Sequence, residues 1–366
     1  MIEIADPIRA IKIPKVKMAH LSSITDDTGV LQHTKYGIPN PKYGYTTDDN
    51  ARALLASVKH YELTLEEESL MLARTYLAFL QWMQREDGLF HNEASYDRRI
   101  LDEVGSLACQ GHAVWALSWT AVSKIPLGMR VAAFEMLEQM PIESILTDTS
   151  IHVPSFVIYG LAELKEKVGS NGSERITMRS SWELVLENAV EVLLNLYKQN
   201  ASDDWKWFID EMTWGVGAPC AALFRAYRLF GDEQILHVAL SAYEFMCDVV
   251  FEGGLFQPIG CKGWFRKNGK RAYFDQQPIE AMWMFFAAQE AFKCLGRKLD
   301  IHRAMLALGW FFGLNVHGVE LYDESTGACY DGLHEFGINM NQGAEATIAA
   351  LLTLIAFVQS DLCKNK

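Results

Sequence analysis

The chain has 366 residues, of which 50% are hydrophobic and 22% charged, so intrinsic disorder is excluded. Asp and Glu outnumber Lys and Arg by 46 to 33, a formal charge of −13. This charge disfavours a nucleic acid or an anionic membrane as partner, and no Lys/Arg-rich run reverses it locally.

The N-terminus lacks the continuous apolar stretch of a secretory signal. The most apolar run, Ala346–Val358, is too short to span a membrane. We therefore expect a cytoplasmic protein.

Helical periodicity dominates, and the predicted helices are of two kinds. Six are apolar on nearly every side, as in fully buried helices, and in chain order they cover residues 49–61, 106–122, 153–164, 215–230, 276–295 and 344–358. Between them lie five amphipathic helices, which cover residues 66–85, 127–140, 180–198, 232–251 and 299–313. This alternation predicts an all-α fold, an (α/α)6 toroid of six inner and six outer helices. The sixth outer helix is expected within residues 14–26. An open superhelix of helical hairpins is the competing arrangement.

We expect a single catalytic-type domain over residues 1–366, with residues 1–13 as an N-terminal extension and 360–366 as a C-terminal tail. The turns from inner to outer helices are short, as at residues 63–65. The connections that precede the inner helices are long, at residues 27–48, 86–105, 141–152, 200–214, 252–274 and 315–343. In a ring of hairpins all six long connections lie at one end, where functional loops are expected.

The predicted loop end collects carboxylates and amides from distant parts of the chain. Glu345 is the only charge in the apolar run 343–358, and Glu280 precedes a similar run, so each needs a partner or a shifted pKa. Asp48, Asp49 and Asp275 would also fit as helix caps. The same loops carry many aromatic residues, and aromatic rings with amides and carboxylates around them suit a neutral carbohydrate.

Cleavage of a glycosidic bond requires two carboxyl groups, one as acid and the other as base or nucleophile. We expect Asp49 and Glu345 to be the catalytic pair, with Asp48 and Asp275 as the next candidates. The expected substrate-binding residues are Arg52, Asn50, Tyr45, Gln276, Gln277, Glu280, Asp331, Asn341, His112, Trp207 and Trp214. The sequence thus favours a glycoside hydrolase that acts on a short oligosaccharide, with inversion preferred over retention.

Two other functions remain open. His112 and His152 both lie near the start of an inner helix, and such a pair could move a proton on a sugar carbon in an epimerase or isomerase. A non-catalytic carbohydrate-binding domain is the third reading. No dinucleotide, P-loop, H-E-x-x-H or G-x-S-x-G motif is present, and the seven cysteines form no C-x-x-C pair, so we expect no cofactor and no metal. The sugar, the linkage and the oligomeric state are left undetermined.

Three blocks resemble a bacterial domain of the six-hairpin (α/α)6 glycosidase-like group, which occurs alone or fused to glycosyltransferases. They are the stretch from His20 to Leu55 with TTDDNAR, the segment FDQQPIEA, and the stretch from Trp310 to Leu352 with YDGLHEFGINMNQGAEA. The resemblance implies an (α/α)6 toroid with a function related to carbohydrates. It also implies site roles for Asp48, Asp49, Asn50, Arg52, Asp275, Gln276, Gln277, Glu280, Asp331, Asn341, Gly343 and Glu345.

The chain departs from the group's pattern in the middle. Ile209 stands at an expected Glu in WFIDEMTWGVG, Gly215 and Val216 replace an expected Asp-Asn, and His112 stands in GHAVWAL where Arg is expected. Ala346 replaces a Ser in the last block. These changes bear on the substrate and on one catalytic group.

Overall fold

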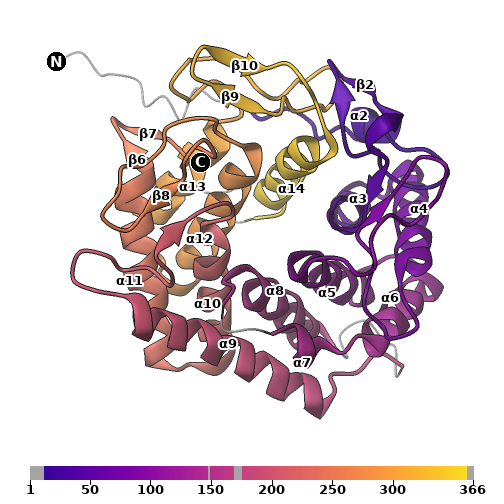
Figure 1. Ribbon diagram of the computed structural model, residues 1–366, viewed down its shortest axis with the longest axis horizontal. Helices are drawn as coiled ribbons and strands as arrows, with labels where there is room; N and C mark the ends of the chain where they lie inside the picture. Colours follow the sequence, from indigo (N-terminus) through magenta and orange to yellow (C-terminus); the bar gives the residue numbers. More distant parts are fainter. Residues whose placement is uncertain (1–11, 147–148, 169–174, 361–366) are drawn as a thin grey trace.

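The inner helices form a closed ring, seen end-on in Figure 1. The structure is a computed structural model that describes residues 12–146, 149–168 and 175–360. The ring consists of α3 (Thr47–Thr64), α5 (Leu107–Ala121), α8 (His152–Lys167), α10 (Gly217–Phe230), α12 (Pro278–Leu295) and α14 (Ala344–Gln359). Each helix packs against the next, and α14 packs against α3. The predicted toroid is confirmed, and the open superhelix is excluded because the last inner helix contacts the first.

An outer layer of helices covers this ring. It consists of α4 (Glu67–Met83), α6 (Leu127–Gln139), α9 (Ser180–Asn200), α11 (Glu233–Val250) and α13 (Lys298–Gly309). Each packs against the inner helix that precedes it in the chain. The expected sixth outer element is α2 (Ala19–Ser23), a helix of five residues that contacts α14. A further short helix, α7 (Ile142–Ile145), lies in the connection before α8.

The long connections at one end of the ring carry short antiparallel strand pairs. These pairs are β1 (Thr34–Lys35) with β2 (Ile38–Pro39), β3 (Tyr45–Thr46) with β4 (Glu93–Ala94), β5 (Glu211–Met212) with β8 (Phe265–Arg266), β6 (Phe251–Glu252) with β7 (Leu255–Phe256), and β9 (Gly332–His334) with β10 (Gly337–Asn339). A 3-10 turn covers Pro41–Tyr43. The pairs β3–β4 and β5–β8 join different connections, so the loops hold one another in place.

Local signals explain where several helices begin and end. The Ser106 hydroxyl accepts a hydrogen bond from the Cys109 backbone N–H and caps α5. Gly231 and Gly296 end α10 and α12 with positive φ angles, which glycine adopts without steric cost. One inner-to-outer connection, from the end of α8 at Lys167 to the start of α9 at Ser180, is longer than the others, as the predicted helix bounds indicate.

One cluster of buried apolar side chains runs through the inner and outer helices. The predicted terminal segments, residues 1–13 and 360–366, lie almost wholly outside the described residues. Among the described residues no helix has both the length and the apolar character needed to cross a membrane. The six cysteines in this part of the chain are free thiols.

Candidate active site

A pocket of about 300 Å³ opens at the end of the ring where the long connections lie. We call it the rim pocket. It is lined by Gln32, His33, Asp48, Asp49, Arg52, Gln277, Pro278, Asp331, Asn339, Gly343, Glu345 and Ala346. These residues come from the first turns of α3, α12 and α14 and from the connections before α3 and α14. The N-termini of three inner helices therefore meet at this pocket.

Arg52 joins two inner helices at the bottom of the rim pocket. Its Nη2 donates to Asp49 Oδ1 (2.9 Å) on α3, and its Nη1 donates to Glu345 Oε2 (3.0 Å) on α14. Burial works to lower the pKa of Arg52, but the charges of Glu345, Asp49 and Asp48 outweigh it and raise that pKa. The guanidinium therefore stays charged and fixed between Asp49, one helix turn away on α3, and Glu345, which is 293 residues from Arg52 along the chain.

The two carboxylates on Arg52 differ in accessibility. The Asp49 side chain is only 5% exposed, and its Oδ2 also accepts a hydrogen bond from the Thr46 hydroxyl (2.9 Å). Burial, with the nearby charges of Asp48 and Glu345, raises the pKa of Asp49 to about 7 against the opposing effect of Arg52. The Glu345 side chain is 45% exposed and faces the pocket. Glu345 is thus the carboxylate of this pair that a ligand can reach.

Asp331 and Asp48 provide two further carboxylates in the rim pocket. Asp331 Oδ1 accepts a hydrogen bond from the backbone N–H of Gly343 (2.6 Å), at the N-terminus of α14. Burial and the charge of Glu345 raise the pKa of Asp331. Asp48 Oδ1 accepts from the backbone N–H of Asp49 (2.9 Å). The pocket therefore combines one fixed cation with four carboxylates that differ in burial.

Several other predicted site residues lie outside the rim pocket. Asn50 is buried and links the connection before α3 to that helix, through Val30 N–H (2.9 Å) and the Thr46 carbonyl (2.8 Å). The Tyr45 hydroxyl donates to Asp26 Oδ2 (2.6 Å). Gln276 is buried and accepts from Trp310 Nε1 (2.9 Å), whereas its neighbour Gln277 does line the pocket.

Glu280 and Asp275 have partners of their own. Glu280 is 1% exposed and accepts hydrogen bonds from the backbone N–H groups of Gly215 (2.7 Å) and Val216 (3.4 Å), and burial raises its pKa to about 8. Asp275 lies at the same end of the ring, paired with His334 Nδ1 (2.9 Å) and Lys262 Nζ (3.2 Å). Because α12 begins at Pro278 with Gln277 as its N-cap, Asp275 is not the helix cap.

The histidine pair lies beneath the rim, inside the ring. The His112 ring stacks on Phe156 (4.3 Å between centroids), and the His152 ring stacks on Trp214 (3.8 Å). His152 Nε2 donates to the Trp214 carbonyl (2.6 Å). Burial lowers the pKa of both histidines, that of His152 to about 4, so both rings are neutral near pH 7. Neither residue lines the rim pocket, and Trp207 is also fully buried.

The remaining predicted residue, Asn341, lies beside the rim pocket. It lines a neighbouring pocket of about 420 Å³ with Tyr43, and the two pockets share His33, Asp331 and Asn339. Gln32, His33 and Asn339 were not predicted as site residues. All three lie in the first and last of the blocks that resemble the six-hairpin group. This resemblance is the only sequence feature that points to them, because no local pattern marks a loop residue as pocket-lining.

Within the described residues no three His, Cys, Asp or Glu side chains are grouped so as to hold a metal ion. The charged groups that line the rim pocket include four carboxylates and one guanidinium. Closed packing of six inner helices, with a polar pocket at their N-termini, decides the fold class. The fold is that of the six-hairpin glycosidase-like (α/α)6 proteins.

Solved structures share this six-hairpin fold over almost the whole chain. A sugar epimerase from a ruminal bacterium is 14% identical, with 97% of this chain and 99% of that chain covered and a TM-score of 0.71. A D-mannose isomerase is 12% identical, with 94% of each chain covered and a TM-score of 0.69. A GH76 alpha-mannanase from Bacteroides thetaiotaomicron is 10% identical, with 88% of each chain covered and a TM-score of 0.59. No protein-family model and no curated protein matches the chain.

Proposed function

We propose that the chain is a sugar epimerase or isomerase that moves a proton on a reducing aldose or ketose in the rim pocket. The observation that carries this proposal is the fixed guanidinium of Arg52, which is bound to the buried Asp49 and to the accessible Glu345. A positive charge held in place by carboxylates suits a reaction in which negative charge develops on a substrate oxygen.

Each residue has a defined part in the proposed reaction. Glu345 removes the proton from the carbon next to the sugar carbonyl, and Arg52 faces the enediolate oxygen that becomes negative. Asp331 or Asp48 returns a proton, to the opposite face of the same carbon for epimerisation or to the neighbouring carbon for isomerisation; in isomerisation the proton of the C2 hydroxyl also moves to the former carbonyl oxygen. The carboxyl groups with raised pKa, Asp331 and Asp49, are better suited than an ordinary Asp to hold a proton near neutral pH.

The pocket and the structural similarities support this choice over glycoside cleavage. A pocket of about 300 Å³ suits one or two sugar rings. The epimerase and the isomerase superpose with higher TM-scores, 0.71 and 0.69, than the mannanase, 0.59. We assign the roles of acid and base to carboxylates and not to His112 and His152. Both histidines lie outside the rim pocket, and burial lowers their pKa values.

An inverting glycoside hydrolase is the second candidate. It is favoured by the raised pKa of Asp49, which would keep a general acid protonated, and by the carboxylates from other segments around it. The neighbouring pocket with Asn341 and Tyr43 would then hold a second sugar ring. A non-catalytic sugar-binding domain would use the same pocket without turnover.

The test is incubation of the protein with mannose, glucose, fructose and mannobiose in D2O, followed by NMR. We expect deuterium to enter at C2 of a monosaccharide with no cleavage of mannobiose. The Glu345→Gln variant should lower this rate by about 100-fold or more, since it removes the base. Arg52→Lys should lower it by a similar factor. Asp210→Asn, an exposed change at the same end of the ring, is the matched control and should leave the rate unchanged.

Release of mannose from mannobiose without deuterium at C2 would instead establish the hydrolase. Binding of sugars without either reaction would establish the binding domain. Full epimerisation in Glu345→Gln would overturn the assigned role of Glu345.

A further inference from the structure

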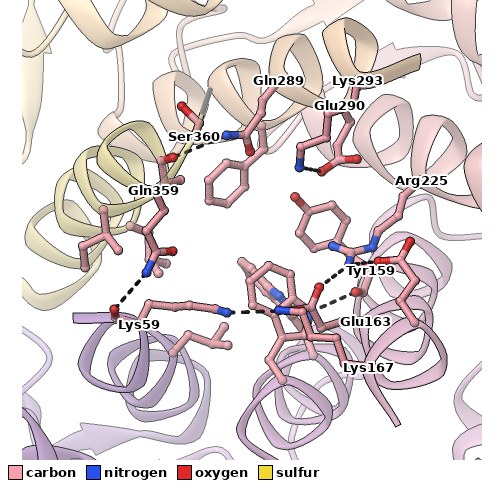
Figure 2. A pocket seen from close by; sticks show the side chains of 18 of the residues that line it. Lys59, Tyr159, Glu163, Lys167, Arg225, Gln289, Glu290, Lys293, Gln359 and Ser360 are labelled. Atoms are coloured by element: carbon pink, nitrogen blue, oxygen red, sulfur yellow. Dashed lines mark hydrogen bonds and ion pairs between the residues drawn. The ribbon is translucent and has the colours of Figure 1, made fainter. Parts of the chain in front are cut away.

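A second hollow, of about 350 Å³, lies at the opposite end of the ring, where the inner helices end. We call it the basal cavity. Figure 2 shows Lys59, Tyr159, Arg225 and Glu290 around it, and these residues come from α3, α8, α10 and α12. None of the residues that line the rim pocket lines the basal cavity. It is therefore a separate feature of the molecule.

A layer of aromatic side chains separates the two hollows. The Trp115 and Trp283 rings lie 5.1 Å apart, and the Phe156 ring stacks on Trp283 at 5.5 Å. Along each inner helix, residues three or four positions apart follow one another down the ring. On α12, for example, Glu280 lies under the rim, Trp283 lies in the aromatic layer, and Glu290 reaches the basal cavity. The centre of the toroid is thus closed at mid-height.

The basal cavity carries positive charge in a strongly negative protein. Five basic and three acidic side chains line it, a formal charge of +2 where the whole chain has −13. The basic residues are Lys59, Lys167, Arg225, Arg228 and Lys293, and they come from four helices. The C-terminal ends of the inner helices, with their negative dipole ends, favour cations at this place.

Every carboxylate in the basal cavity is bound by more than one cation. Glu163 pairs with Arg225 and Lys167 and lies 3.8 Å from Lys59 Nζ. Burial opposes ionisation of Glu163, but these three cations outweigh it and lower its pKa. Glu290 likewise pairs with Arg228 and Lys293. Glu62, which is not among the lining residues, also binds Lys59 Nζ (3.1 Å), so the five cations hold four carboxylates and exceed them by one.

Two buried donors among the lining residues have no acceptor. The Arg225 side chain is 4% exposed, and its Nε has no hydrogen-bond partner within the described part of the chain. Nε1 of Trp115 is also buried and unpaired there. Buried donors are nearly always paired, so these two are unsatisfied polar groups among the residues that line the cavity.

Aromatic faces lie directly beside these cations. Lys59 Nζ lies 4.6 Å from the centre of the Trp119 ring, and the Arg225 guanidinium lies 5.0 Å from that of Tyr159. The Trp119 and Tyr159 rings stack on each other at 5.5 Å, and Tyr159 is buried whereas Trp119 is only partly buried. A flat or ring-shaped ligand body can pack against Trp119 while its charged group meets the cations.

We propose that the basal cavity binds a small organic anion, with its phosphate or carboxylate group held by Lys59, Lys167 and Arg225 and its ring packed against Trp119. A phosphorylated sugar and a sugar acid share this chemistry. The site is independent of the rim pocket, so it does not rest on the proposed reaction.

The experiment is isothermal titration calorimetry of the whole chain with glucose 6-phosphate, glucuronate, inorganic phosphate and glucose. We expect the two organic anions to bind more tightly than phosphate, and any binding of glucose, which belongs to the rim pocket, to be unchanged in the variants below. A lower Kd for glucose 6-phosphate than for glucuronate would identify the phosphorylated sugar as the ligand, and the reverse order the sugar acid.

Two variants with opposite effects test the role of charge. The double variant Lys167→Gln and Lys293→Gln should weaken anion binding about fivefold or more, because it removes two cations. It should fold normally, because Glu163 remains ion-paired with Arg225 and Glu290 with Arg228. Glu166→Gln removes a competing carboxylate and should tighten binding about twofold or more.

Two controls separate this site from the rest of the molecule. Lys198→Gln changes an exposed lysine on α9 and should leave the Kd unchanged. Glu345→Gln in the rim pocket should also leave it unchanged, whatever its effect on turnover. No anion binding at millimolar concentration, or equal weakening in the Lys198→Gln control, would overturn the proposal. An anion Kd that stays unchanged in the Lys167→Gln and Lys293→Gln double variant would overturn it as well.

Discussion

Glu345 and Glu280 are acidic residues in the first turns of two apolar inner helices, yet the structure gives them different environments. Glu345 is half-exposed in the rim pocket and bound to Arg52. Glu280 is buried and holds the backbone N–H groups of Gly215 and Val216. The sequence identified both as charges that need partners, and both have them. Only the packing of the neighbouring segments makes one accessible and the other structural.

The neutral His152 ring should make the protein sensitive to acid. Its pKa is lowered to about 4 from 6.5, so the unfolded chain binds more protons than the folded one between these values. Stability is therefore lost as the pH falls from about 6.5 to 4, by about 3 kcal/mol at most for this residue. His152→Gln keeps a donor for the Trp214 carbonyl. Urea denaturation at pH 7 and pH 4.5 should show a smaller loss in this variant, and an equal loss in both proteins would contradict the assignment.

The inner helices approach one another closely enough that glycine is required at their contacts. A Cβ atom built on Gly217 of α10 would lie 2.2 Å from the backbone oxygen of Trp283 on α12. On Gly160 of α8 it would lie 2.9 Å from the Trp115 Cα on α5. Such contacts fix the spacing of α10 and α12 and of α8 and α5 in the ring.

Gly217→Ala should destabilise the protein by about 2 kcal/mol or more, because α10 and α12 must separate to admit the methyl group. Gly128→Ala on the outer helix α6 is the matched control. A Cβ there meets nothing within 4 Å, so the same change should be neutral or stabilise by up to about 1 kcal/mol. Chemical denaturation of both variants measures the difference. Equal stability of the two would show that the ring tolerates wider helix spacing.

The ring is closed by the N-terminal segment of the described chain, which lies against the C-terminal part in Figure 1. The backbone N–H of His20 donates to the Thr326 carbonyl (2.9 Å), and His20 Nε2 donates to that of Gln342 (2.9 Å). Leu21 of α2 is fully buried, and α2 contacts α14. A helix of five residues therefore completes the outer layer, aided by hydrogen bonds to the last long connection.

Leu21→Ala should lower the free energy of unfolding by about 2–4 kcal/mol, since it leaves a cavity where the ring closes. Leu127→Ala removes the same atoms from an exposed site on α6 and should change it by about 0.5 kcal/mol at most. Thermal unfolding followed by circular dichroism compares the two. A Leu21→Ala protein as stable as the Leu127→Ala control would mean that α2 does not contribute to closing the ring.

The sequence by itself determined the helices and their order. Burial patterns repeat within three or four residues, so local periodicity was enough to separate inner from outer helices and to place the long connections at one end. It also identified Asp48, Asp49, Arg52 and Glu345, which do meet in one pocket. It could not distinguish these residues from Asn50 or Gln276, whose side chains are hydrogen-bonded to other parts of the protein and stabilise the loops.

Only the tertiary structure decided the contacts that depend on ring closure. Arg52 meets Glu345 because the last inner helix packs against the first, and no local pattern encodes a pairing across 293 residues. The basal cavity is a second case. Its five cations are distributed over four helices, so no run of basic residues in the sequence predicted the cavity. Short-range periodicity sets which face of a helix is buried, but the partners of that face are set by how all the helices pack together.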